Sequence, residues 1–347
     1  VIIDSTNLHT WEADPELTLK MRASYYLMGA LIGRFTRAQV PPPGGCNFGT
    51  RPIDQHLKGF RALGAEIDIE HGKISAEAER LVGKHIYFDV VSVGATINVM
   101  MAAAMAEGQT IMENVAKEPH IVDVANFLNS VGADIIGAGT DIIKINGVKE
   151  LKGNATYSVV PDQIEAGTFM LAAIASKGDI TIRNCITKHL ESIIAKVVEI
   201  GGNVYENGDY CRVWYTRRTH KATIKTLPYP GFPTDLQPQM GVALSVATGT
   251  SRIIENIWES RFQYTAELNK MGAKIYGAGS NKIKIVGVKE LKEVSYKIMP
   301  DRIEAGTFLC LAAINHSNLL VKNIAKTIFA TVSLTQVECF KHPFAVF

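Results

Sequence analysis

The chain has 347 residues, of which 47% are hydrophobic and 20% charged, and its formal net charge is +2. This length can bury a large core or two, and the balanced charge, without a long block of Lys and Arg, argues against a nucleic-acid partner. The apolar run at residues 99–106 is far shorter than the roughly 20 residues that a membrane-spanning helix needs, and the start carries no secretory signal. We therefore expect a soluble globular protein without a membrane partner.

The cysteines are few and scattered, at Cys46, Cys185, Cys211, Cys310 and Cys339. Their odd number argues against a disulfide framework, and the lack of a CxxC pair or a His cluster at ligand spacing argues against a zinc site. A reducing cytoplasm fits best. The chain opens on the apolar run Val1-Ile2-Ile3 without a methionine, so we expect it to lack its natural front end.

One short pattern recurs along the chain with a period of about 70 residues. In each copy an amphipathic stretch ends at a glycine and a β-like run follows, which is typical of a helix that stops before a strand. The four stretches cover residues 53–63, 120–131, 190–200 and 262–271, and they close at Gly64, Gly132, Gly201 and Gly272.

A second, more apolar helix recurs at the same period. It is predicted over residues 24–35, 95–107, 166–177, 237–248 and 305–315, and strands such as Thr110–Met112 follow several copies. Each unit is then two helices packed on a small mixed sheet. Such units are too long for the usual solenoid repeats, so a few of them should pack together as globular domains. We expect two α/β domains with a boundary near residue 160.

The loop Pro42–Pro52 combines several prolines and glycines with Cys46 and Arg51. Glycines free a backbone to approach a ligand or to move as a lid, and Cys46 is expected to be exposed because buried cysteines usually lie in apolar runs. A nearby guanidinium favours the thiolate, which suits a nucleophile or a proton donor near neutral pH. The alternative is a surface turn with an incidental cysteine.

Polar or charged residues mark the starts of the five apolar helices. These residues are Arg22, Ser92, Asp162, Asp235 and Asp301. Ser and Asp are ordinary N-caps, each worth roughly 1 kcal/mol, so capping can explain any single one. If the helix starts converge, however, their dipoles and free amides form an anion site, where Arg22 would bind a phosphate or carboxylate. The set therefore predicts an anionic ligand.

In these helix starts and in the loop around Cys46, the chain resembles the UDP-N-acetylglucosamine enolpyruvyl transferases. These are the 1-carboxyvinyltransferases that catalyse the first committed step of bacterial peptidoglycan synthesis. The resemblance runs from about residue 16 to residue 295. It rests on strings that are specific in combination: Lys20-Met21-Arg22-Ala23-Ser24, Pro43-Gly44-Gly45-Cys46, Arg51-Pro52-Ile53-Asp54, Ser92-Val93-Gly94-Ala95-Thr96, Pro161-Asp162, Phe232-Pro233-Thr234-Asp235 and Glu259-Ser260-Arg261-Phe262.

The resemblance implies an inside-out α/β barrel pair, the enolpyruvyl transferase fold, whose buried helices point their N-termini into one cleft. Residues 1–160 would form the domain with the Cys46 lid, incomplete at its N-terminus, and residues 161–347 the domain with Asp235. The implied reaction moves the enolpyruvyl group of phosphoenolpyruvate onto the 3′-hydroxyl of UDP-N-acetylglucosamine, through a tetrahedral intermediate that expels phosphate. It requires no metal and no organic cofactor.

By position, Cys46 matches the family's lid cysteine, the general acid toward C3 of the enol and the target of fosfomycin. Asp235 matches the carboxylate that draws the proton from the sugar 3′-hydroxyl. Arg22 and Arg51, with Cys46, match the phosphoenolpyruvate contacts. The positions that match the family's UDP-N-acetylglucosamine contacts are Arg51, Pro52, Ile53, Asp54, Gln55, Ser92, Val93, Asp235 and Ile257. Val90 stands where the family often carries a lysine.

The chain departs from the family pattern at both ends. The family begins earlier, with a strand and a helix that bear a Lys-Asn pair for phosphoenolpyruvate, so we expect an N-terminal unit to be missing. Residues 277–315 closely repeat residues 137–175, including the string GVKEL. Asp301-Arg302 then stands where the family's phosphoenolpyruvate-binding arginine is expected, and the chain is atypical after about residue 295.

Two alternatives stay open beside an active transferase. A catalytically impaired homologue would bind UDP-N-acetylglucosamine without turnover, because the predicted nucleotide contacts survive better than those for phosphoenolpyruvate. A transferase acting on shikimate 3-phosphate would keep the chemistry, as the sister enzyme of aromatic synthesis does, but the Gly-Gly-Cys46 lid and the string at residues 51–54 disfavour it.

Overall fold

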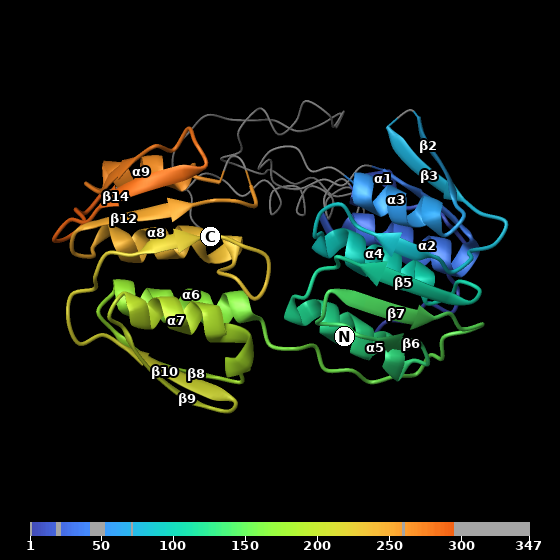
Figure 1. Cartoon of the computed structure of the whole chain (residues 1–347), viewed down its shortest axis with the longest axis horizontal. Helices are drawn as coiled ribbons and strands as arrows, with labels where there is room; N and C mark the ends of the chain where they lie inside the picture. Colours follow the sequence, from blue (N-terminus) through green and yellow to red (C-terminus); the bar gives the residue numbers. More distant parts are fainter. Residues whose placement is uncertain (1, 19–21, 42–52, 71, 259–260, 295–347) are drawn as a thin grey trace, which may run out of the picture.

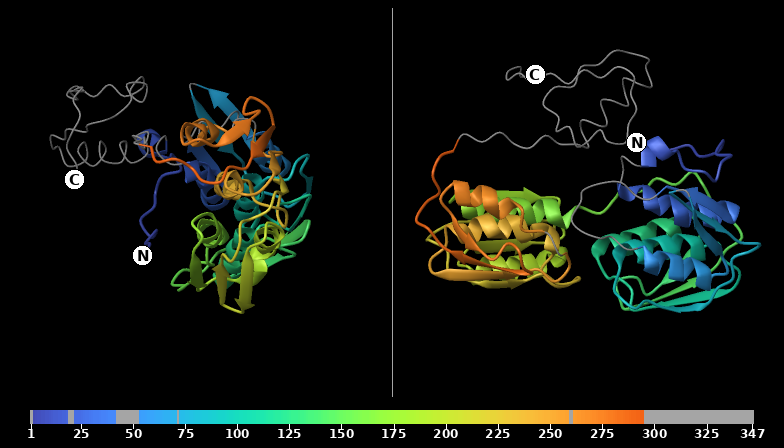
Figure 2. Two further views of the ribbon diagram at one scale, coloured as in Figure 1. Left: turned by 90° about the vertical axis from the view of Figure 1, so that its left-hand side faces the viewer. Right: turned by 90° about the horizontal axis from the view of Figure 1, so that it is seen from above.

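The chain folds into two lobes that lie side by side (Figures 1 and 2). The structure is a computed structural model, and it describes residues 2–18, 22–41, 53–70, 72–258 and 261–294, with only the backbone of Arg22. Residues 147–162 join the lobes. No helix in these ranges is both long enough and apolar enough to span a membrane.

The helices and strands of the first lobe are α1 (Pro15–Thr18), the 3₁₀ helix η1 (Arg22–Tyr25), α2 (Tyr26–Phe35), β1 (Arg37–Val40), α3 (Asp54–Ala62), β2 (Glu66–Glu70), β3 (Lys73–Glu77), β4 (His85–Tyr87), α4 (Val93–Ala103), β5 (Gln109–Glu113), α5 (Pro119–Ser130), β6 (Asp134–Ile136) and β7 (Ile142–Asn146). Those of the second lobe are α6 (Gln163–Ala175), β8 (Asp179–Arg183), η2 (Thr187–Leu190), α7 (Glu191–Glu199), β9 (Asn203–Asn207), β10 (Tyr210–Trp214), β11 (Thr223–Lys225), η3 (Thr234–Leu236), α8 (Gln237–Ser245), β12 (Thr250–Ile254), α9 (Tyr264–Lys270), β13 (Lys274–Tyr276) and β14 (Lys282–Val286).

Each lobe holds two small sheets with apolar helices between them. Helix α4 buries residues all round its circumference, as a helix enclosed by protein must, and it packs against α2, while α6 packs against α8. One apolar core extends from Met28 to Ile145 and a second from Ala166 to Ile285. Helices inside and sheets outside form the inside-out α/β architecture that was expected. The boundary at residue 160 stays a proposal, and it lies between these two cores.

The sheets are only partly of the predicted mixed kind. The order β4-β5-β7-β6 places β4 parallel to β5, and β11-β12-β14-β13 places β11 parallel to β12. Sheets β1-β3-β2 and β8-β10-β9 contain only antiparallel pairs among their named strands. In the first of these, a parallel bridge between Glu12 and Gln39 takes the place of a fourth strand.

The predicted glycine stops are confirmed at all four positions. Gly64, Gly132, Gly201 and Gly272 follow α3, α5, α7 and α9 with φ between 89° and 105°, a region that favours glycine. In the first copy the Gly64 amide donates to the Arg61 carbonyl and the Ala65 amide to the Phe60 carbonyl. This is the Schellman motif, and the same pair of bonds recurs in the other three copies. Each unit therefore turns from helix to strand in the same way.

Helices α2 and α4 approach each other most closely at Gly29. A Cβ atom there would lie 2.2 Å from the Asn98 carbonyl oxygen, so no larger residue fits. The Asn98 side chain is fully buried, accepts from the Gly29 amide at 2.8 Å and donates to the Tyr25 carbonyl at 2.8 Å. These bonds fix the turn at which η1 becomes α2.

The segment between the lobes is attached to α5 through Tyr157. Its hydroxyl donates to the Asp123 carboxylate at 2.8 Å, and its ring meets the edge of Phe127. Burial and the hydrogen bond to Asp123 raise the pKa of Tyr157 to about 12. This tyrosine stays neutral in the folded protein over most of the alkaline range.

We expect Gly29→Ala to lower the free energy of unfolding by about 1–3 kcal/mol, although alanine is normally the better helix residue, because the Asn98 carbonyl cannot move away cheaply. Urea unfolding would measure the change. Gly153→Ala is the matched control, since a Cβ at Gly153 meets nothing within 4 Å. Equal midpoints for the two variants would show that α2 and α4 pack more loosely than described.

Tyr157→Phe should cost about 1 kcal/mol of stability near neutral pH, because it removes one hydrogen bond and keeps the ring contact. The folded-state pKa lies above the ordinary value of 10.0, so this contribution is fully present below pH 10 and is lost as the pH rises through about 12. Urea midpoints of wild type and variant should therefore converge over that interval. Tyr276→Phe, at an exposed position, should leave the urea midpoint unchanged both near neutral pH and near pH 12. A gap that stayed constant to pH 12 would contradict the assignment.

Candidate functional site

A cleft of about 1060 Å³ lies between the lobes. Helices of both lobes begin at its walls, and the lining residues at their starts are Tyr25, Asp54, Val93, Pro119, Gln163, Ser192 and Thr234. The first amides of a helix have no partner within the helix and carry a partial positive charge. Their convergence makes the cleft suitable for an anionic ligand.

The cleft collects those predicted site residues whose side chains the structure describes. They are Ile53, Asp54, Gln55, Ser92, Val93, Asp235 and Ile257. They come from separate elements of both lobes. Cys46, Arg51, Pro52 and the pair Asp301-Arg302 lie outside the described residues, as does the side chain of Arg22, whose backbone begins η1.

Capping accounts for two of the polar residues at helix starts. The Ser92 hydroxyl accepts from the Ala95 amide at 3.3 Å, and the Asp162 carboxylate accepts from the Ile164 amide at 2.7 Å. Asp235 differs, because it lies inside η3, whose N-cap Pro233 provides no side-chain bond. Its carboxylate is therefore available for another role.

Asp235 is held by an arginine from the following segment. Its Oδ1 atom pairs with Nη2 of Arg261 at 2.6 Å. The Asp235 side chain remains 57% exposed, whereas that of Arg261 is only 14% exposed. The carboxylate is thus anchored and still open to the cleft. Sequence reasoning missed Arg261, although it lies in the string Glu259–Phe262 that resembles the family.

Gln55 connects two walls of the cleft through its buried amide. Nε2 donates to the Asp54 carboxylate at 2.7 Å and to Asp89 at 3.2 Å, and Oε1 accepts from the Asp89 amide at 2.9 Å. Lys58 also donates to Asp89, and together with Gln55 it keeps the pKa of that carboxyl below its usual range. The start of α3 is thereby tied to the loop before Ser92.

The lobes also contact each other directly across the cleft. The Tyr229 amide of the second lobe donates to Oε1 of Glu118 in the first lobe at 3.5 Å. Both residues line the cleft.

Carboxylates dominate the charge of the described cleft walls. The acidic lining residues are Asp54, Glu118, Asp123, Asp162 and Asp235, and the basic ones are His56, His120 and Arg261. Val90 lines the wall without a charge. Positive potential for an anion would come from the helix starts and from the predicted clamp of Arg22 and Arg51. Within the described ranges no group of three His, Cys, Asp or Glu side chains could hold a metal ion.

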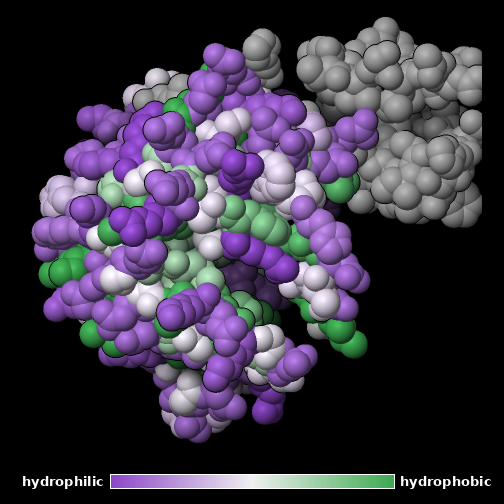
Figure 3. Space-filling view, turned by 90° about the vertical axis from the view of Figure 1, so that its right-hand side faces the viewer, coloured by the Kyte–Doolittle hydropathy of each residue, from purple (hydrophilic) through white to green (hydrophobic). Residues whose placement is uncertain are grey.

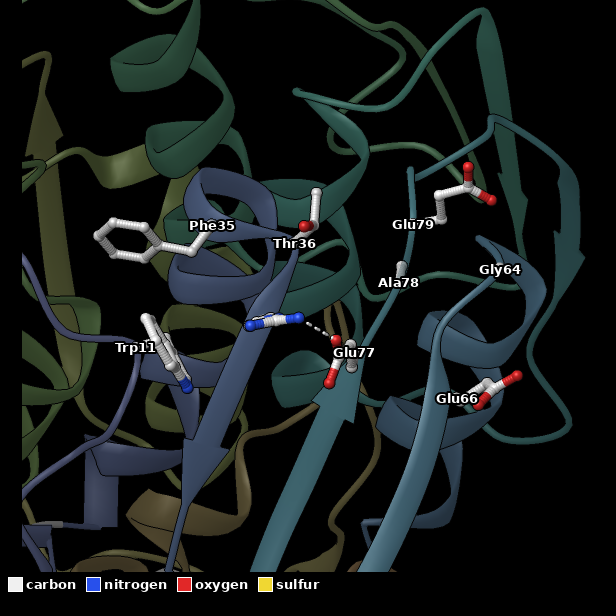
Figure 4. Close-up of a pocket in the computed structure, with 9 residues that line it drawn as sticks. Trp11, Phe35, Thr36, Gly64, Glu66, Glu77, Ala78 and Glu79 are labelled. Carbon is white, nitrogen blue, oxygen red and sulfur yellow. Dashed lines mark ion pairs between the residues drawn. The ribbon is translucent and has the colours of Figure 1, made fainter.

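A second hollow, of about 840 Å³, lies on the first lobe (Figure 4). Its lining includes Trp11 and the ion pair of Arg37 with Glu77, and the Arg37 guanidinium lies 5.7 Å from the Trp11 ring centroid. Hydrophilic side chains cover most of the outer side of this lobe (Figure 3). None of the predicted site residues lines this hollow.

Comparisons of sequence all match this chain to 1-carboxyvinyltransferases. A family model described as EPSP synthase (3-phosphoshikimate 1-carboxyvinyltransferase) matches residues 1–279 and, a second time, residues 268–338. A protein of Clostridium botulinum named UDP-N-acetylglucosamine 1-carboxyvinyltransferase is 58% identical over 312 residues, 90% of this chain and 74% of its own length. A Clostridium acetobutylicum protein with the same name, numbered 2, is 52% identical over 342 residues, 99% of this chain and 77% of its own. The similarity therefore extends beyond residues 16–295.

Comparison of structures agrees on the fold. The enolpyruvyl transferase NikO from Streptomyces tendae superimposes with a TM-score of 0.72 at 21% identity, over 82% of this chain and 67% of that one. An EPSP synthase from Acinetobacter baumannii gives a TM-score of 0.57 at 20% identity, over 78% of this chain and 64% of that one. Both share the inside-out α/β fold.

Proposed function

Because the chain belongs to the EPSP synthase family of 1-carboxyvinyltransferases, we propose that it transfers the enolpyruvyl group of phosphoenolpyruvate to the 3′-hydroxyl of UDP-N-acetylglucosamine. This is the first committed step of peptidoglycan synthesis. One observation carries the proposal: residues 53–55, 92–93, 235 and 257, which match the family's sugar-nucleotide contacts by position, line a single cleft. The names of the relatives favour this acceptor over shikimate 3-phosphate, and they favour turnover over binding alone.

In the proposed reaction the 3′-oxygen of the sugar bonds to C2 of phosphoenolpyruvate while C3 gains a proton. The tetrahedral intermediate then loses a proton from C3 as the bond from C2 to the phosphate oxygen breaks. Asp235 accepts the hydroxyl proton, and Cys46 supplies the proton to C3. Because Oδ1 of Asp235 pairs with Arg261, Oδ2 is the oxygen left for the hydroxyl. The ion pair with Arg261 also fixes the direction in which the carboxylate faces.

The charge of the substrates is offset from two sources. Arg22 and Arg51 contact phosphoenolpyruvate as cations, and the starts of α3 and α4 present backbone amides to the diphosphate. Preorganised donors of this kind stabilise the charge that develops as phosphate departs. The scattered cysteines and the balanced net charge support a cytoplasmic location without a nucleic-acid partner.

We expect the purified chain to release phosphate only when both substrates are present. Shikimate 3-phosphate should not replace UDP-N-acetylglucosamine, and Cys46→Ser should abolish release. The fosfomycin epoxide should open on the Cys46 sulfur, with the ring oxygen taking up a proton. Peptide mapping should find this adduct at Cys46 and not at Cys185 or Cys211, which are buried; burial also raises the pKa of Cys211 to about 12. Saturable sugar-nucleotide binding without release would favour the non-catalytic homologue instead.

Asp235→Asn should lower turnover roughly 10²- to 10⁴-fold, the usual contribution of a general base, while UDP-N-acetylglucosamine binds with a dissociation constant within severalfold of wild type. Asp123→Asn is the matched control, because it neutralises another carboxylate of the cleft that has no part in the mechanism. Steady-state kinetics and calorimetric titration would separate the two effects. Similar turnover in both variants would remove Asp235 from the role of base.

A further inference from the structure

A buried carboxylate lies behind the cleft at the end of β12. Glu255 is only 2% exposed, and both of its oxygens accept hydrogen bonds. Oε1 accepts from the Thr226 hydroxyl at 2.7 Å and from the amides of Ile257 and Trp258 at 2.9 and 3.2 Å. Oε2 accepts from the Thr234 hydroxyl at 2.9 Å. A buried charge is tolerated when it is bonded in this way, and it then fixes the groups that bond to it.

Thr234 links this carboxylate to Asp235. Its hydroxyl donates to Glu255 and accepts from Nη1 of Arg261 at 3.2 Å, while Nη2 of Arg261 pairs with Asp235 at 2.6 Å. A hydroxyl has a single proton, so donation to Glu255 directs the lone pairs of Thr234 toward the arginine. The contacts therefore form a chain that runs from the buried Glu255 through Thr234 and Arg261 to Asp235 at the cleft.

The same carboxylate also holds another part of the cleft lining. Its bonds to the amides of Ile257 and Trp258 set the turn that follows β12, and both of these residues line the cleft. Ile257 is a predicted contact of the sugar nucleotide. One buried group thus orients both the residue that would take the proton and a wall that would hold the substrate.

We propose that Glu255 and Thr234 are positioning residues for this site, acting on Asp235 through Arg261. The inference rests on the proposed function of Asp235. An ion pair at the surface is weak because a long side chain must be ordered to form it. Thr234 holds one end of the guanidinium and so orders it in advance, as outer partners do for the groups that touch a substrate.

Thr234→Val tests the link, and Thr226→Val is its matched control. Both substitutions remove a hydroxyl bonded to Glu255, but only Thr234 also contacts Arg261. In a crystal structure of Thr234→Val we expect the Arg261 guanidinium to have left Asp235, and in Thr226→Val to have kept it. Thr234→Ser retains the hydroxyl and should keep the pair.

The split between kcat and KM provides the second readout. In Thr234→Val the kcat should fall roughly tenfold, the effect of one charge-assisted hydrogen bond, while KM for UDP-N-acetylglucosamine stays within severalfold of wild type. Thr234→Ser retains the hydroxyl and should restore kcat. Thr226→Val should lower the melting temperature without this loss of kcat.

Failure of this inference and failure of the proposed function give different results. An active wild type, together with a Thr234→Val variant that keeps both the ion pair and the wild-type kcat, would overturn the positioning role. A wild type that releases no phosphate would overturn the proposed function. In that case the crystal structures of the two variants still test the link from Thr234 to Asp235. Loss of the Arg261–Asp235 ion pair in Thr234→Val but not in Thr226→Val would support the link. An ion pair that is present in both variants would refute it.

Discussion

A helix enclosed on all sides has only its ends free to meet polar groups, and this constraint places the site. Helix α4 is buried all round, so the amides of its first turn cannot face apolar side chains without a large desolvation cost. Ser92 satisfies one of them, and the start of the helix faces the cleft. The start of α6, which is buried along one face, also faces the cleft, and Asp162 is its cap. The fold thus directs unpaired amides from both lobes toward one space.

The local features of this fold could be read from the sequence, because they depend on residues close together along the chain. The glycines at 64, 132, 201 and 272 ended their helices as expected, and the four apolar helices that lie in the described residues began within a few residues of their predicted starts. The predicted helix at residues 305–315 lies outside the described residues. The contacts that set the site depend on tertiary packing. Asn98 meets Gly29 across 69 positions, about one repeat period, but the repeat does not specify which side chain bonds to which backbone group. Thr234 meets Arg261 across 27 positions, a separation that matches no repeat in the chain.

The two lobes contribute unlike parts to the cleft. The first provides the segments around residues 53–55 and 92–93, where the Gln55 amide joins α3 to the loop before α4. The second provides Asp235 and the turn after β12. The resemblance to the family pointed to both sets, whereas the repeated helix starts made Ser92, Asp162 and Asp235 look alike. Their different hydrogen bonds distinguish two caps from one carboxylate that an arginine holds at the surface of the cleft.

The four Schellman closures make the units alike at their junctions. Each passes from helix to strand through one glycine with the same pair of backbone bonds, so the geometry of a junction does not depend on which unit precedes it. A gene in which one unit is copied or exchanged would then encode a chain whose new junctions are free of strain. A duplication, a recombined gene or an assembled sequence would each leave a close repeat such as that of residues 137–175 in residues 277–315.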